Sequence, residues 1–108
     1  MIHIIKTKVT TQQLDEMLKE LAPIIIDIRL GILAGSGQMH ADCEAALIED
    51  GSQQEDIWGA NWIPATQTLE FEALINLRPK QQNYAMSIQN PEIKHQIERI
   101  SKLLLESA

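Results

Sequence analysis

The sequence predicts an α+β fold, a two-layer sandwich in which a mixed sheet of four or five strands carries two helices on one face. Two observations predict this class. Apolar side chains recur at helical spacing in two segments, each of which begins at a capping residue. Other segments alternate apolar and polar residues, as strands with one buried face do. The chain has 108 residues and no linker rich in glycine, serine or proline, so we expect one domain over residues 1–108.

The first expected elements are a strand over residues 2–6 and a helix over residues 11–22. Thr10 is followed three residues later by Gln13, which is the spacing of a capping box. The helix then carries one apolar stripe, formed by Leu14, Met17, Leu18 and Leu21. Pro23 disfavours helical geometry in the residue before it and therefore ends this helix.

The middle of the chain is predicted to be extended. Residues 24–30 are rich in isoleucine and alternate toward their end, and residues 39–47 alternate apolar with polar side chains. Three glycines between these segments indicate a bend. An Asp-Gly pair at residues 50–51 is a hairpin signal, so we expect the chain to return through residues 56–58.

Residues 59–64 are predicted to form a loop, and residues 69–77 form the clearest alternating strand. A short strand over residues 84–88 is expected to follow. The opening strand, helix and strand should form a right-handed parallel crossover, while the middle strands should pair antiparallel. These two kinds of pairing make the predicted sheet mixed.

The last helix has the strongest signals in the chain. Asn90 provides a cap, Pro91 occupies the first helical position, and the helix is expected to extend to about residue 106. Its apolar stripe is formed by Ile93, Ile97, Ile100 and Leu104, with Leu103 beside it. Glu98 and Lys102 are spaced to form a favourable pair on its exposed side.

With both helices on one face, the other face of the predicted sheet is left uncovered and polar. Its side chains come from three strands: Asp27 and Arg29, then His40, Asp42 and Glu44, then Glu70 and Glu72. One interpretation is a solvated surface, because antiparallel sheets often leave one face in water. The alternative is a ligand-binding site formed by Asp27, Arg29, His40, Asp42 and Glu44.

His40, Asp42 and Glu44 are also candidate metal ligands, because alternate residues of a strand leave it on the same side. Two carboxylates and an imidazole suit a hard or borderline divalent ion, which could activate water for hydrolysis. A further ligand would come from Asp27 or Glu72. The same alternation sends Cys43 into the core, where we expect it to behave as a small apolar residue.

Trp58 and Trp62 lie within five residues of each other in a chain with only 4% aromatic residues. They either cap the core or bind a partner, so we include them among the candidate ligand-binding residues. A small sheet with free edges and an uncovered face is readily completed by a second copy. We therefore expect a homodimer.

Charge and composition narrow the classes of partner. A net charge of −6 repels phosphate backbones and disfavours nucleic-acid binding. The sequence contains no apolar run long enough for a signal peptide or a membrane span, so we expect a cytoplasmic protein without membrane contact. A single cysteine excludes an internal disulfide and a zinc site with several thiolates. No motif identifies a cofactor.

Five segments carry a resemblance to a known family, namely residues 31–35, 39–44, 49–52, 57–60 and 76–79. Through them the chain resembles a family of small bacterial proteins that is frequent in photosynthetic bacteria and classed as a domain of unknown function. The resemblance is strong over residues 27–78, is expected to extend to the last helix, and implies a similar fold. It implies no activity, so no catalytic residue is carried over.

These observations leave functions from different classes. The first is a non-catalytic domain that associates with itself, and binds a small ligand or protein, through the polar sheet face and the tryptophans. The second is a metal-dependent hydrolase that uses His40, Asp42 and Glu44. A third, nucleic-acid binding by Arg78, Lys80, Arg99 and Lys102 with Tyr84, is disfavoured by the net charge.

Overall fold

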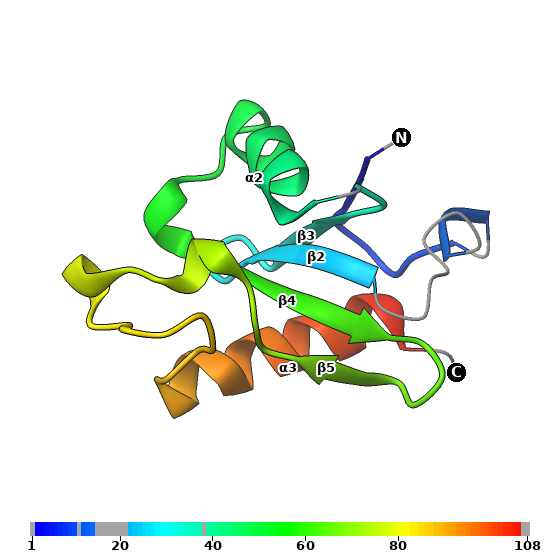
Figure 1. Ribbon diagram of the computed structural model, residues 1–108. Helices are drawn as coiled ribbons and strands as arrows, with labels where there is room; N and C mark the ends of the chain where they lie inside the picture. The colour runs from blue at the N-terminus through cyan, green and yellow to red at the C-terminus, as the bar shows by residue number, and fades with distance from the viewer. Residues whose placement is uncertain (1, 11, 15–21, 38, 107–108) are drawn as a thin grey trace.

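The computed structural model describes residues 2–10, 12–14, 22–37 and 39–106, and it confirms the α+β class. Its sheet and helices follow each other along the chain as shown in Figure 1: β1 (His3–Ile5), β2 (Ala22–Asp27), β3 (Ile32–Gly35), α2 (His40–Glu49), β4 (Ile57–Ile63), β5 (Thr68–Glu70) and α3 (Pro91–Leu105). Three single 3-10 turns join them, η1 (Gln54–Asp56), η2 (Leu74–Asn76) and η3 (Pro79–Gln81).

The sheet has the strand order β1-β3-β2-β4-β5, and every neighbouring pair is antiparallel. The predicted mixed sheet with a parallel crossover is therefore wrong, because β1 pairs with β3 rather than with β2. Strand β2 ends at Asp27, whose carboxylate accepts hydrogen bonds from the main-chain N–H groups of Arg29 and Leu30. This side chain closes a tight turn, so residues 28–30 form the β2–β3 hairpin instead of more strand.

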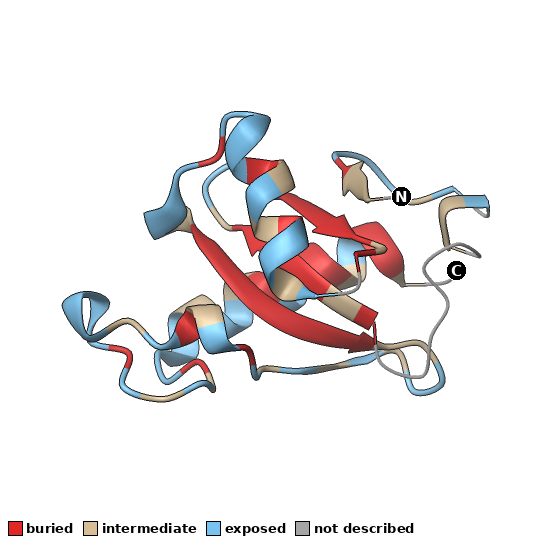
Figure 2. Ribbon diagram, turned by 45° about the horizontal axis from the view of Figure 1, so that its top comes forward, coloured by how far each residue is buried: buried red, intermediate tan, exposed pale blue. Residues whose placement is uncertain are grey.

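The helices lie on opposite faces of the sheet, α2 on one and α3 on the other (Figure 1). The predicted uncovered face is therefore absent. Ile24, Ile25 and Ile26 are each fully buried, so β2 is covered on both sides. Their uninterrupted apolar run is typical of a strand between two layers. Figure 2 shows the central strands buried between the helices.

Residues 39–47, predicted to be a strand, belong mainly to helix α2. Cys43 and Leu47 lie four residues apart and face the sheet, where both are buried. The carboxylate of Asp42 accepts the main-chain N–H of Met39 at 3.2 Å and closes the first turn. The apparent alternation rested on alanines, which are the best helix formers and small enough for either face of a strand.

Helix α3 confirms the prediction of a capped C-terminal helix. The side-chain oxygen of Asn90 accepts the N–H groups of Glu92 and Ile93, and the carboxylate of Glu98 lies 3.6 Å from the Lys102 ammonium. The predicted stripe is buried at Ile97, Ile100 and Leu104, with Ile93 packed partly buried against the same core. Leu103, expected beside the stripe, is 66% exposed, and the neighbouring Leu105 is buried instead.

Two further assignments in the second half are wrong. Residues 59–63, predicted to be in a loop, belong to the central strand β4. The strand predicted over residues 69–77 is only Thr68–Glu70, and the segment at 84–88 makes a single bridge between Glu72 and Ser87. Both tryptophans are 1% exposed in the core on the α3 side.

The predicted capping box of the first helix is present. The hydroxyl of Thr10 accepts the Gln13 N–H at 3.1 Å, and the Gln13 side chain accepts the Thr10 N–H at 3.0 Å. Residues 12–14 are helical, and most of the rest of this expected helix lies outside the described residues.

Candidate binding site

The sequence-predicted site residues do not form one cluster. Asp27 is fully buried and accepts a hydrogen bond from the Ser52 hydroxyl at 2.7 Å in addition to its bonds in the hairpin. Arg29 is exposed and pairs with Asp56 at 2.8 Å. Both residues hold the β2–β3 hairpin against the segment that follows α2, so their role here is structural.

The strand geometry that supported the metal prediction is absent. Residues two apart on a helix point about 200° apart, so Asp42 does not share a side with His40 and Glu44, and the three cannot bind one ion as alternate residues of a strand would. His40 Nε2 lies 2.7 Å from the carbonyl oxygen of Ala60, while Asp42 closes the start of α2. In the described part of the chain, no group of three histidine, cysteine, aspartate or glutamate side chains is placed to hold a metal ion.

Glu44 lies instead in a groove between α2 and the chain that follows β5. The groove encloses about 620 Å³ and is lined by Glu44, Gln54, Glu55, Ile75, Leu77, Arg78, Pro79, Lys80 and Gln81. Its walls therefore combine two acids, two bases and three apolar residues. We call it the α2–loop groove.

Next to this groove, the side chain of Asn76 makes hydrogen bonds to β4 that a neighbouring strand would otherwise make. It is fully buried, its side-chain oxygen accepts the Gly59 N–H at 2.8 Å, and its amide nitrogen donates to the Gly59 carbonyl at 2.9 Å. The same nitrogen donates to the Met86 carbonyl at 3.1 Å. Because β5 is short, one side chain supplies the bonds that a longer strand would make. Gly59 is required here, since an added Cβ would lie 2.5 Å from Cβ of Ala73.

Arg78 closes the groove beside Asn76. Its guanidinium donates to the carbonyls of Ile75 at 2.7 Å, Gln54 at 2.9 Å and Ile57 at 2.5 Å, and to the side-chain oxygen of Gln81 at 3.2 Å. It also lies 4.7 Å from the ring centre of Trp58. Burial lowers the pKa of Arg78 from its ordinary value, and the negative charge of Glu44 partly opposes this shift. The side chain is a fixed cation whose donors are mostly occupied.

Glu44 is the least satisfied side chain of the groove. Its Oε2 atom is buried and has no hydrogen-bond partner among the described residues. An unpaired carboxylate oxygen is costly to bury, so a donor from outside the chain would be favourable at this position.

Exposed apolar side chains continue the groove toward the start of α2. A second hollow of about 320 Å³, lined in part by Met39, His40 and Leu74, shares the wall residue Ile75 with the α2–loop groove. Around Ile75, Met39 is 64%, Leu74 70% and Leu77 46% exposed. We call these three exposed residues the apolar rim.

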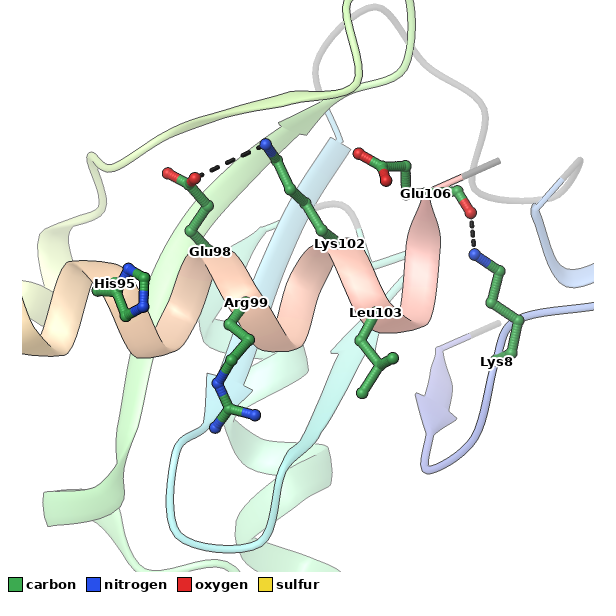
Figure 3. A pocket seen from close by; sticks show the side chains of 7 residues that line it. All are labelled: Lys8, His95, Glu98, Arg99, Lys102, Leu103 and Glu106. Atoms are coloured by element: carbon green, nitrogen blue, oxygen red, sulfur yellow. Dashed lines mark hydrogen bonds and ion pairs between the residues drawn. The ribbon is translucent and has the colours of Figure 1, made fainter. Parts of the chain in front are cut away.

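A third hollow, of about 720 Å³, lies along the outer side of α3 (Figure 3). One pair of its charged groups is close, since Lys102 approaches Glu98 at 3.6 Å, and the Lys8 ammonium donates to the main-chain carbonyl of Glu106. In Figure 3, Arg99 points to the other side of the helix from Glu98. The side chains diverge rather than converge, so this surface has the character of a solvated helix face.

Sequence reasoning did not identify Asn76, and it considered Arg78 only as a contact to nucleic acid. Both lie at the end of a segment predicted to be an alternating strand, where an asparagine and an arginine look like ordinary exposed residues. The available signal was their place in the 76–79 segment of the family resemblance. The structure brings this segment against residues 57–60, another segment of that resemblance.

One of the comparisons with known proteins identifies the family. A model of the family described as protein of unknown function (DUF5674) matches residues 3–104, so the chain belongs to this family. No curated protein and no solved structure matches the chain significantly. In the described residues, every helix is too short or too polar to cross a membrane.

Proposed function

We propose that this member of the DUF5674 family is a non-catalytic assembly domain that associates with a second copy of itself through the apolar rim and the α2–loop groove. The observation that supports the proposal is the apolar rim itself. Met39, Leu74 and Leu77 are exposed around one shared residue, Ile75. Single exposed apolar residues are ordinary, whereas a contiguous group beside a groove is typical of an interaction surface.

The charge distribution favours a second copy as the partner. The chain has a formal charge of −6, so two copies repel each other over most of their surface. In the α2–loop groove the acids Glu44 and Glu55 are balanced by the bases Arg78 and Lys80. Two copies can therefore approach at this groove with little repulsion between net charges. A patch with both signs of charge can also be complementary to itself across a two-fold axis.

The lining of the groove supports binding rather than covalent chemistry. Among its described lining residues there is no serine, cysteine or histidine to act as a nucleophile. Cys43 is fully buried under α2. A buried single cysteine suits a reducing compartment, and we place the assembly in the cytoplasm.

Sedimentation velocity over a wide range of protein concentration tests this proposal. The wild-type chain should sediment as a dimer at high concentration and dissociate on dilution. Leu74→Glu places a charge in the apolar rim and should produce a monomer at concentrations where the wild type is dimeric. Leu103→Glu is the matched control, because Leu103 is 66% exposed on α3 and Leu74 is 70% exposed.

Three results would reject the proposal. The first is a wild-type chain that stays monomeric at the highest concentration. The second is a dimer that Leu74→Glu leaves intact, and the third is a dimer that Leu103→Glu disrupts equally. Circular dichroism of both variants shows whether each is folded.

A further inference from the structure

We infer that a small hollow at the start of α3 binds an oxyanion, meaning the phosphate or carboxylate group of a small molecule. The hollow encloses about 310 Å³ and adjoins the α2–loop groove, with which it shares the wall residue Gln81. Its walls include Trp58, Gln82, Asn83, Gln89, Asn90 and Pro91. None of its described lining residues is ionisable, although the chain as a whole has 15 acidic residues.

Two amide side chains of this hollow, those of Gln89 and Asn90, have their oxygens occupied and their nitrogens unoccupied. The oxygen of Gln89 accepts the main-chain N–H of Tyr84 at 2.7 Å. The oxygen of Asn90 accepts two main-chain N–H groups, from Glu92 at 2.9 Å and from Ile93 at 3.3 Å. Main-chain N–H groups can bond only to the oxygen, so the NH₂ groups of Gln89 and Asn90 remain as donors. Neither NH₂ group has an acceptor among the described residues.

Trp58, a wall residue of the same hollow, also carries a donor without a partner among the described residues. Its side chain is part of the wall and is 1% exposed, and its indole Nε1–H is buried without an acceptor among the described residues. Indole Nε1 is a donor only, so it requires an acceptor atom. A buried N–H without a partner costs free energy that a ligand oxygen would recover.

The electrostatic potential at this hollow favours an anion. The hollow lies at the N-terminal end of the 15-residue helix α3, which carries partial positive charge. The Arg78 guanidinium is 4.7 Å from the ring centre of Trp58 and adds a full positive charge. Glu92 in the first turn opposes these contributions. The first-turn N–H groups of Glu92 and Ile93 are already bonded to Asn90, so the helix acts through its dipole and the side chains supply the donors.

Titration by ¹⁵N NMR provides a direct test, because the chain has two tryptophans and therefore two indole N–H signals. Inorganic phosphate and acetate are added separately at millimolar concentration, with sodium chloride at equal ionic strength as the reference. We expect the Trp58 indole signal to shift saturably. The Trp62 indole is the internal control, since it is also 1% exposed and without an acceptor among the described residues, and it should not shift. A response to phosphate alone assigns a phosphate group, and a response to both assigns oxyanions generally.

Two variants remove donors while preserving the fold. Asn90→Asp keeps a good helix cap, and Gln89→Glu keeps the acceptor for Tyr84, but each replaces an NH₂ donor by a negative oxygen. Each should weaken anion binding by about tenfold or more. Gln12→Glu adds the same charge at an exposed position elsewhere and should leave binding unchanged. The inference is overturned if neither anion shifts the Trp58 signal, if the Trp62 signal shifts equally, or if both donor variants bind as the wild type does.

Discussion

The two sides of the sheet are stabilised by different means. On the α3 side, both tryptophans pack with Ile97, Ile100 and Leu104 in the larger apolar cluster. On the α2 side the helix contributes only Cys43 and Leu47 to a smaller cluster of buried residues. Burial of apolar area therefore accounts for most of the stabilisation on the α3 side, and less of it on the α2 side.

At the edge of β4, hydrogen bonds from polar side chains add to the smaller stabilisation that apolar burial gives on the α2 side. Asn76 bonds both main-chain groups of Gly59, and Arg78 bonds the carbonyl of Ile57. Asn83 donates to the carbonyls of Asn76, Ala85 and Ser87 and so connects different parts of the irregular segment over residues 76–87. Hydrogen bonds of this kind contribute little net free energy when they are made but cost much when one partner is removed. The edge of β4 should therefore be sensitive to single polar substitutions, whereas α3 should be sensitive mainly to apolar ones.

Replacing Asn76 with Ala should have the largest effect of the substitutions considered for this comparison. It leaves the buried N–H and carbonyl of Gly59 without their partner, and it leaves the Met86 carbonyl with only the bond from the Ala73 N–H. We expect the free energy of unfolding to fall by about 3–5 kcal/mol, measured by urea denaturation followed by circular dichroism. A loss below about 1 kcal/mol would mean that this asparagine does not act as the substitute for a strand.

The α3 side could be predicted from the sequence because its signals are local. The Asn90-Pro91 start and the spacing of Ile97, Ile100 and Leu104 are all contained within one segment. A cap and a stripe specify a helix whatever it packs against, so this prediction is confirmed. The error at Leu103 was one of rotation about the helix axis, which depends on the neighbouring layer.

The α2 side could not be predicted because its determinants are distant in the sequence. Asn76 meets Gly59 across 17 residues, and Asp27 meets Ser52 across 25. Residues 39–47 satisfy both a strand and a helix pattern because alanines occupy the deciding positions. The predicted polar face and its metal ligands both depend on this segment being a strand. Because the segment is a helix, neither is present among the described residues. The candidate binding site therefore became visible only through the tertiary structure.

Asn90, on the other side of the sheet, is the asparagine with which Asn76 can be compared. Its side chain bonds two main-chain N–H groups, as Asn76 also bonds main-chain groups, but Asn90 is exposed. Water can replace a lost partner there, so Asn90→Ala should lower the free energy of unfolding by only about 1 kcal/mol. Asn90→Asp should leave it nearly unchanged in the same urea titration, because aspartate caps equally well. Equal losses for Asn76→Ala and Asn90→Ala would contradict the proposed difference between the two regions.

The smallest effect is expected at the charged pair on α3. Glu98 and Lys102 are 3.6 Å apart, with side chains 50% and 40% exposed, so water screens their attraction. Lys102→Ala should change the free energy of unfolding by about 0.5 kcal/mol or less, and thermal denaturation at low and high salt should show that the small difference shrinks as salt is added. A loss above about 1 kcal/mol would show that the hollow in Figure 3 is held by its charges. The expected result distinguishes two roles of polar side chains in this molecule. Charges on the outside of α3 can be removed with little change in the free energy of unfolding, whereas the uncharged Asn76 at the edge of β4 cannot.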